Sequence, residues 1–393
     1  MDYTNFLSQR VMQITPSATL EINALAKEYL RQGKPVLSFA TGEPDFSTPP
    51  AVTAAAVEAL KQGKTKYTAT PGIPELREAV AERYRERYGV TYEPGETVIT
   101  VGGKQALYNL FQTILESGDE VVMMSPYWVS YPEMIKLAGG RPIIVSTELD
   151  DGFVPDLERI KTVLSHQTKA ILINSPNNPT GAVYPRKFLE ELVTLAAEHN
   201  LLIISDEIYE DLVYQGEHTC TAALSGARER TVVISGVSKS YSMTGWRLGW
   251  AVGPEVLIKA MVTLQSHSTS NATSVAQYAA LAALTHEVPE VAQMRQAFAR
   301  RRELMYSMLK EVPGLKVALP QGAFYLFVDI RGVEGISSSQ EFCRRLLSES
   351  YVATVPGEAF GAPGHMRLSY AASEQDIAEG CRRIAEFVRR MTG

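Results

Sequence analysis

Lys239 and Arg247 lie eight residues apart in a stretch rich in serine and glycine, residues 235–249. An apolar, β-branched run precedes the stretch and predicts a buried strand that ends in small residues. A lysine amine can form a Schiff base with a carbonyl, and an arginine guanidinium can clamp a phosphate. The pair therefore suits a ligand that carries both groups. A solvated lysine in a turn and a surface arginine are the structural alternative.

Two other motifs in the chain are incomplete. The segment from Gly236 to Ser240 resembles a nucleophile elbow, but it ends in serine where that motif needs glycine. Gly63-Lys64-Thr65 resembles the end of a phosphate-binding loop, but Glu58 stands where the first glycine is required. The Schiff-base interpretation of Lys239 therefore has no complete rival motif.

Seven short apolar runs, separated by helical or loop segments, predict a sheet. This alternation is typical of a mostly parallel sheet covered by helices on both faces. Ligands of such sheets bind beyond the carboxyl ends of the strands, so the residues after each run are candidate site residues. The runs cover residues 98–101, 120–124, 142–145, 170–174, 201–205, 231–235 and 248–252.

Polar and aromatic residues follow directly after these runs. The glycines before Lys104 would leave helix amides free to hold an anion such as phosphate. Taken singly, Asn178 could form an Asx turn, Asp206 a helix N-cap and Trp128 a half-buried core ring. Together they would place an anion site, a ring, an amide, an acid, a phenol, an amine and a guanidinium on one rim. The residues are Gly103, Lys104, Trp128, Asn178, Asp206, Tyr209, Lys239 and Arg247.

The remaining chain predicts helices and a smaller α/β unit. Thr15-Pro16-Ser17 predicts the start of a helix that ends at Gly33. A long helical stretch is expected after Val252, to about residue 285. Arg367 falls within a short predicted strand, where it could lie at a sheet edge or form a fork for a carboxylate. Further helices are expected at 50–63, 74–88, 291–310 and at the C-terminus, and strands near 324–330, 352–355 and 366–369.

Composition excludes several classes of function. The net charge is −6 and no block of Lys or Arg occurs, which argues against a nucleic-acid partner. Three cysteines share no CxxC spacing and the six histidines are scattered, so we expect neither a disulfide framework nor a metal site. The N-terminus lacks an apolar h-region and no run could span a bilayer. We therefore expect a cytoplasmic protein without a membrane partner.

These residues together resemble the pyridoxal-phosphate-dependent aminotransferases of class I/II, which have fold type I. The resemblance covers nearly the whole chain and includes TGEPDF, SPYWVSYPEM, NSPNNPTGAVY, SDEIYEDL and MRLSYA in the family's order. PSAT around Thr19 and GGKQAL around Lys104 resemble, more narrowly, the bacterial and plant-plastid type of aspartate aminotransferase. Several members of that subgroup also act on prephenate.

The resemblance implies a cofactor, pyridoxal 5′-phosphate, and a role for each site residue. Lys239 would hold the cofactor as a Schiff base and then act as the general base. Asp206 would pair with the pyridine nitrogen, and Tyr209 and Asn178 would bind the ring's phenolate oxygen. Trp128 would stack on the ring. The phosphate would be held by Gly103, the Lys104 backbone and Arg247, with Ser235 or Ser238 in place of the serine that animal-type enzymes have at Gly236.

The resemblance also implies how substrate is bound. Arg367, with Asn178 and the Gly42 backbone, would bind the α-carboxylate. The segment 265–273 lacks the cation that animal-type enzymes use for the distal carboxylate, so Thr19 and Lys104 would take that role. A tyrosine matching Tyr67 reaches the phosphate of the other subunit in this family, which implies a homodimer with active sites at the subunit interface.

The expected enzyme is an aspartate:2-oxoglutarate aminotransferase with a ping-pong cycle, and prephenate is a further candidate substrate. The alternatives are an aminotransferase for alanine or aromatic amino acids, a C–S β-lyase or ring-forming synthase on the same scaffold, and a non-catalytic binding protein. The expected fold is a large, mostly parallel seven-stranded sheet domain with helices on both faces, plus a small α/β domain built from both termini. The expected boundaries are 1–45 for an N-terminal arm and part of the small domain, 46–285 for the cofactor-binding domain and 286–393 for the C-terminal small domain.

Overall fold

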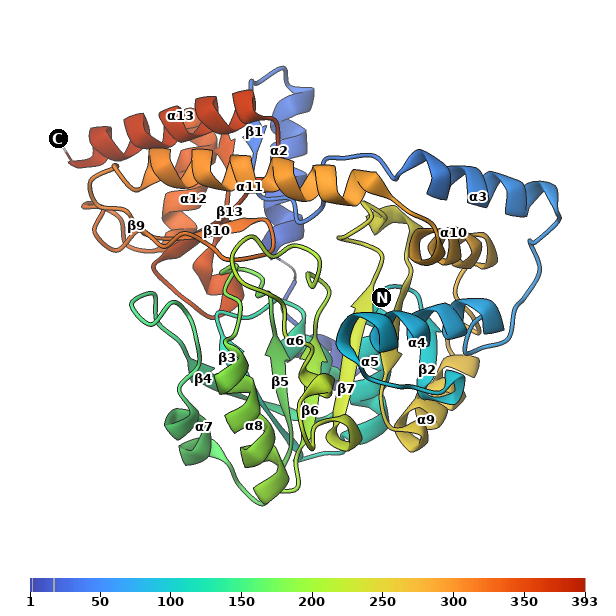
Figure 1. Ribbon diagram of the computed structural model, residues 1–393. Coiled ribbons are helices and arrows are strands. Elements are labelled where there is room, and N and C mark those ends of the chain that lie inside the picture. Colours follow the sequence, from blue (N-terminus) through green and yellow to red (C-terminus); the bar gives the residue numbers. More distant parts are fainter. Residues whose placement is uncertain (2, 17, 393) are drawn as a thin grey trace.

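The computed structural model describes residues 1, 3–16 and 18–392, and a seven-stranded sheet forms its centre (Figure 1). The ends of each predicted run lie within two residues of the ends of a strand. All neighbouring strands pair in parallel except β8, which is antiparallel to both of its neighbours. In spatial order the strands are β2 (Thr97–Thr100), β8 (Gly249–Val252), β7 (Thr231–Gly236), β6 (Leu202–Asp206), β5 (Thr168–Asn174), β3 (Glu120–Ser125) and β4 (Arg141–Ser146).

Alternate side chains of the strands point to two separate cores. Ile204 packs in the core under α5, α6 and α9, whereas its neighbour Ile203 packs in the core under α7 and α8 on the other face. Val233 and Trp250 extend this second face toward α4 and α10, and α3 packs on α10. The buried strands read as continuous apolar runs because helices cover both faces. The helices are α3 (Pro50–Lys61), α4 (Pro74–Tyr88), α5 (Gly103–Ile114), α6 (Tyr131–Leu137), α7 (Leu157–Val163), α8 (Arg186–Glu198), α9 (Glu255–Ser266) and α10 (Ser274–Thr285).

A smaller α/β layer, at the upper left of Figure 1, is built from both ends of the chain. Its antiparallel sheet has the order β12 (Val355–Pro356), β13 (His365–Ser369), β10 (Tyr325–Asp329) and β9 (Lys316–Val317). Near the N-terminus, β1 (Leu37–Ser38) pairs in parallel with β11 (Val352–Ala353). The helices of this smaller layer are α2 (Ala18–Arg31), α11 (Pro289–Leu309), α12 (Ser339–Ser350) and α13 (Glu374–Thr392).

Three expectations need correction or limits. The helical stretch after Val252 is two helices, because residues 267–273 are rich in serine, threonine and asparagine and Ser270 is left-handed with φ 61. The strand expected at 352–355 is split between β11 and β12, which belong to different sheets. The start of α2 at Ala18 agrees with the sequence, but Ser17 lies outside the described residues.

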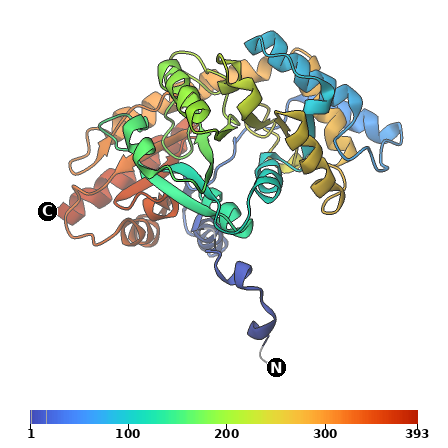
Figure 2. The ribbon, with the colours of Figure 1, turned by 90° about the horizontal axis from the view of Figure 1, so that it is seen from below.

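The N-terminal segment before α2 extends away from the rest of the chain (Figure 2). It contains α1 (Gln9–Met12) and a 3₁₀ helix (Thr4–Phe6), neither of which has a buried residue. Among the described residues, no helix has the length and apolarity that crossing a membrane requires. The remaining 3₁₀ helices are Pro94–Glu96, Thr221–Ala223, Arg228–Arg230, Thr244–Trp246 and Gly357–Phe360.

Candidate active site

A pocket of about 430 Å³ lies beyond the carboxyl ends of β5, β6 and β7, and the smaller α/β layer contributes part of its wall. Of the predicted site residues, Tyr67 and the candidate serine Ser235 are absent from its lining, and Tyr67 is 90% exposed. The predicted residues that line the pocket are Thr19, Gly42, Gly103, Lys104, Trp128, Asn178, Asp206, Tyr209, Lys239, Arg247 and Arg367.

Lys239 reaches the pocket from the turn after β7, and its amine donates a hydrogen bond to the carbonyl of Gly42. Burial, together with the positive charge of Arg367, lowers the pKa of Lys239 to about 8. At pH 7 about a tenth of the amine is therefore neutral, far more than for a solvated lysine. Only the neutral amine can attack a carbonyl, so the environment suits the chemistry that the sequence predicts.

Asp206 is the last residue of β6 and is 5% exposed. Its Oδ2 accepts a 2.6 Å hydrogen bond from the Tyr131 hydroxyl, and its Oδ1 accepts a 3.2 Å bond from the Ile208 amide. Burial raises the pKa of Asp206 to about 6, although the Tyr131 hydrogen bond opposes the rise. A carboxylate in this setting is stabilised by a cationic ring nitrogen.

Sequence reasoning missed Tyr131, which begins α6. A signal was present, because Tyr131 follows Trp128 by three residues and their rings meet edge to face at 5.3 Å. Tyr325 was also missed, and its hydroxyl lies 2.9 Å from that of Tyr209. An aromatic residue in a short strand is usually a core residue, so no local sequence signal identified Tyr325 as a site residue.

Arg367 lies on β13 between β10 and β12, so the possibility that it merely occupies a sheet edge is wrong. It is 2% exposed, donates to Asn178 Oδ1 at 2.9 Å and to the Ala40 carbonyl at 2.8 Å, and its Nε has no hydrogen-bond partner. Its guanidinium also lies over the Tyr325 ring, 4.4 Å from the centroid. Within the described part of the chain, Arg367 has no carboxylate partner. A buried guanidinium in this state calls for an anionic ligand.

The N-terminus of α5 and Arg247 form an anion cradle. Gly102 precedes the helix with φ 79, and a Cβ at this position would lie 2.7 Å from Nη2 of Arg247. The guanidinium therefore lies directly against the helix N-terminus, where free amides and the helix dipole favour an anion. Close packing of β8 supports the cradle, since a Cβ on Gly249 would lie 2.4 Å from the Gly103 amide nitrogen.

The two candidate serines differ in position. Ser238 lines the pocket, whereas Ser235 does not. The Ser235 hydroxyl instead donates to Glu210 Oε1 at 3.1 Å. Ser238 is therefore the serine that faces a ligand. The donor set as a whole fits pyridoxal phosphate, because it offers an amine, a carboxylate, a phenol with an amide, an aromatic ring and a phosphate cradle.

Thr19 and Lys104 reach the same pocket from α2 and α5. The Lys104 amine lies 4.7 Å from the centroid of the Trp128 ring. Burial and the nearby Arg247 lower the pKa of Lys104. Lys104 forms no ion pair with any described carboxylate. Besides Arg367 and the Arg247 of the anion cradle, it is therefore a further cation available for an anionic group.

The family model "Aminotransferase class I and II" matches residues 34–384, and the chain belongs to this family. It is an aminotransferase whose cofactor is pyridoxal 5′-phosphate. The fold-type expectation from the sequence is confirmed.

Relatives and solved structures match over almost the full length. The aspartate/prephenate aminotransferase of Thermus thermophilus is 49% identical over 98% of this chain and 99% of its own. The aspartate aminotransferase of Bacillus subtilis is 46% identical over 98% and 99%. The structure of the Thermus thermophilus aspartate aminotransferase with maleate matches with a TM-score of 0.94 at 49% identity, over 97% of this chain and 99% of that chain. The Rhizobium meliloti aspartate aminotransferase matches with a TM-score of 0.95 at 38% identity, over 98% and 99%.

Proposed function

We propose that this protein transfers the amino group of L-aspartate to 2-oxoglutarate, giving oxaloacetate and L-glutamate, by a ping-pong cycle. The observation that carries the proposal is the pair of cations, Arg367 and Lys104, that line one pocket from separate elements without a carboxylate partner among the described residues. With Arg247 assigned to the cofactor phosphate and Lys239 to the Schiff base, these two cations match the two carboxylates of aspartate or glutamate. The names of the full-length relatives support the same substrates.

Arg367 binds the α-carboxylate in this proposal. Its remaining donor capacity and burial favour a tight, directional pair with a planar carboxylate. Asn178, whose Oδ1 accepts from Arg367, keeps the fork in one orientation. The Gly42 backbone lies alongside, and a side chain there would collide with the Tyr325 hydroxyl at 2.9 Å.

Lys239 moves the proton from Cα of the substrate. A pKa of about 8 leaves the amine able to accept a proton near neutral pH and to return it later in the cycle. Asp206 holds a proton on the ring nitrogen, and Tyr209 with Asn178 binds the ring oxygen. Pyridoxal phosphate, when bound, supplies the electron sink for the charge left by this proton transfer.

Lys104 and Thr19 bind the distal carboxylate. The same subsite could receive the ring carboxylate of prephenate, while Arg367 holds the carboxylate of its 2-oxo acid side chain. Relatives named aspartate/prephenate aminotransferases support this second substrate. Conversion of prephenate to arogenate with an amino-acid donor is the direct assay for it.

The protein acts as a homodimer in this proposal, with Tyr67 reaching the phosphate in the partner's site. The exposure of Tyr67 supports the proposal, as does the N-terminal segment, which leaves Tyr3, Phe6, Leu7, Val11 and Met12 exposed. Mass measurement in solution tests the oligomer. The domain boundaries at 45/46 and 285/286 are part of the same proposal, and limited proteolysis tests them.

A half-reaction titration tests the substrate assignment. The holoenzyme is mixed with aspartate, glutamate, alanine, tyrosine or arogenate, and the absorbance of the cofactor is followed. We expect aspartate and glutamate to change the spectrum at the lowest concentrations. A change with alanine or tyrosine but not with aspartate would refute the dicarboxylate assignment. Release of pyruvate and ammonia from cystathionine without an oxo acid would instead indicate a β-lyase.

A further inference from the structure

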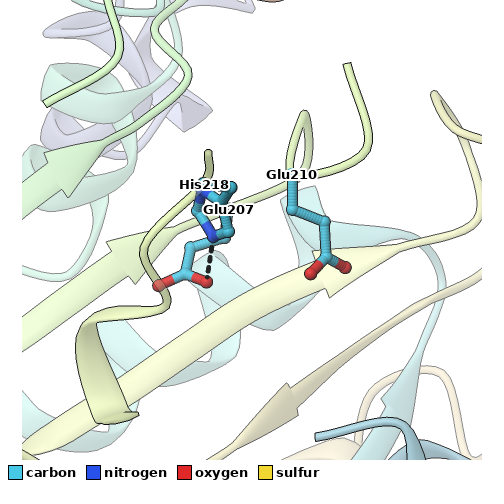
Figure 3. A group of neighbouring side chains, drawn as sticks. All are labelled: Glu207, Glu210 and His218. Carbon is cyan, nitrogen blue, oxygen red and sulfur yellow. Dashed lines mark hydrogen bonds and ion pairs between the residues drawn. The ribbon is translucent and has the colours of Figure 1, made fainter. Parts of the chain in front are cut away.

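The segment from Asp206 to Asp211 has two faces. Asp206 and Tyr209 line the pocket, whereas Glu207 and Glu210 are absent from its lining. Both glutamates are nonetheless buried, with 1% and 4% of their surface exposed, and their side chains gather beside His218 (Figure 3). Buried carboxylates require partners, so the contacts of this second face show what it does.

Glu207 connects the end of β6 to a later loop. Its Oε1 accepts 2.9 Å hydrogen bonds from the Ser205 hydroxyl and the Thr221 amide. Its Oε2 lies 2.8 Å from Nε2 of His218. Both carboxylate oxygens are therefore satisfied by groups on either side of the turn.

Glu210 and Asp211 attach the same turn to α4. Arg83 donates from Nη2 to Glu210 Oε1 at 3.2 Å and to Asp211 Oδ2 at 2.8 Å, and Arg87 Nη1 lies 2.6 Å from Asp211 Oδ1. The Tyr88 hydroxyl also donates to Glu210. Three residues of one helix thus hold the two acids.

A metal ion does not account for this cluster, although ligand atoms of Glu207, Glu210 and His218 lie within 4.8 Å of one another. Glu210 already accepts from Arg83, and Arg87 lies 3.9 Å from it. A cation here would stand beside two guanidinium groups and would displace hydrogen bonds from satisfied carboxylates. The cluster is an internal ionic network.

The charges of the network balance when His218 is protonated. Burial alone would lower the pKa of His218, but the charge of Glu207 and the hydrogen bond to it outweigh burial, and the pKa is raised. His218 then adds a third cation to Arg83 and Arg87, against three carboxylates. Burial also raises the pKa values of the other titratable groups that face the network. Five of them stay protonated, namely Tyr84, Tyr88, Tyr92, Tyr241 and Cys220, and the sixth is Asp206 of the pocket.

We propose that this buried network positions Asp206 and Tyr209 against the cofactor, which makes Glu207 and Glu210 positioning residues for the reaction. The inference rests on the proposed function, because it takes Asp206 to pair with the ring nitrogen and Tyr209 to bind the ring oxygen. Each glutamate is the next residue in the chain after the site residue that it positions. The turn is also fixed by backbone bonds, from the Glu207 amide to Ile234 O and from the Glu210 amide to Glu207 O.

The network reaches Lys239 as well. The Ser235 hydroxyl on β7 donates to Glu210, so the end of the strand before Lys239 is tied to the turn after β6. A loosened network would therefore change the distances among the acid, the phenol and the amine. Errors of this kind reduce catalysis more than they reduce substrate binding, because Arg367 is attached elsewhere.

Glu207→Gln and Glu210→Gln test the proposal, since each keeps the side-chain shape and removes the charge. The purified holoenzymes are compared for the dissociation constant of pyridoxal phosphate, the pH midpoint of the cofactor absorbance band, and kcat and KM for aspartate. We expect kcat to fall roughly ten- to hundredfold and the cofactor to bind more weakly. The absorbance midpoint should shift, while KM stays within about threefold of the wild type.

Glu217→Gln is the matched control, because Glu217 is exposed and adjacent to His218 and loses the same charge. It should keep wild-type values. If Glu207→Gln or Glu210→Gln fails to fold, Ser205→Ala and Ser235→Ala each remove one hydrogen-bond donor from the same two carboxylates and take their place in the comparison.

A lower Tm with an unchanged absorbance midpoint, cofactor affinity and kcat would overturn the proposal, because the network would then serve stability alone. Failure of the proposed function gives a different result. In that case the wild type would bind pyridoxal phosphate but show no spectral change with aspartate. The variants could still be compared by their cofactor affinity and absorbance midpoint, because neither measurement depends on turnover of aspartate.

Discussion

The Tyr131 hydroxyl donates a 2.6 Å hydrogen bond to Oδ2 of Asp206. Asp206 comes from the end of a central strand and Tyr131 from the first turn of α6, and the hydrogen bond joins them in the lining of the pocket. Since Trp128 precedes Tyr131 on the same segment and touches its ring, one segment both supports the acid and presents an aromatic face to the pocket.

Tyr131→Phe should weaken the enzyme without unfolding it. Loss of a hydrogen bond to a charged group costs about 1.5–3 kcal/mol, so we expect kcat to fall roughly ten- to hundredfold. The pKa of Asp206 should rise further, because the Tyr131 bond opposes the effect of burial. Tyr184→Phe, at a buried tyrosine that packs on Phe188, is the control. Equal kcat for the two variants would contradict the role of Tyr131.

Arg367→Lys should raise KM for aspartate. A lysine ammonium cannot reproduce the planar fork, and the loss of one charge-assisted hydrogen bond is worth roughly tenfold or more in binding. Cofactor affinity should stay near the wild-type value, because the proposed role of Arg367 is with the substrate. Steady-state kinetics and cofactor titration separate the two effects. Arg331→Lys, at an exposed arginine paired with Asp329, controls for the loss of a guanidinium.

Lys104→Gln should change substrate preference rather than general activity. Removing the cation should lower kcat/KM for aspartate by about tenfold, because a charge-assisted interaction of modest strength is lost. Alanine turnover should stay nearly unchanged. The ratio of kcat/KM for aspartate to that for alanine is the measurement. Thr19→Val should change this ratio in the same direction. An equal fall in kcat/KM for both substrates would show that Lys104 does not bind the distal carboxylate.

His218→Gln should make stability less dependent on pH. The pKa of His218 in the folded protein lies above its ordinary value. Charged His218 therefore contributes stability that is fully present below about pH 6.5 and is lost as pH rises through the folded-state pKa. The difference in unfolding free energy between wild type and variant should be larger at pH 6 than at pH 9, as measured by urea unfolding. A difference that grows with pH would contradict this assignment.

Gly249→Ala should destabilise the sheet and the anion cradle together. The added Cβ would lie 2.4 Å from the Gly103 amide nitrogen, a backbone atom that cannot move aside alone. Overpacking of this kind typically costs about 1–3 kcal/mol. Gly245→Ala is the matched comparison, because a Cβ on Gly245 would meet no atom within 4 Å and the φ of Gly245 is not positive. The Tm of thermal unfolding and the affinity for the cofactor should both fall for Gly249→Ala and stay unchanged for Gly245→Ala.

Much of this protein follows from the sequence because its strongest signals are local. Buried parallel strands appear as continuous apolar runs, and ligand groups follow the ends of such strands, so Asp206 and Lys239 could be named in advance. The family motifs extend this to Asn178, Arg247 and Arg367. Chemistry that depends only on residue type and on position after a strand can be predicted from the sequence.

Contacts between distant elements were decided only by the tertiary structure. The antiparallel direction of β8 places Arg247 beside the α5 N-terminus, and the central position of β13 buries Arg367. Likewise, Ser235 turns toward Glu210 while Ser238 lines the pocket. These outcomes depend on strand pairing and on close packing between segments far apart in the chain, which local periodicity does not encode. The residue types set the chemistry, and the packing of the sheet decided which of them share a pocket.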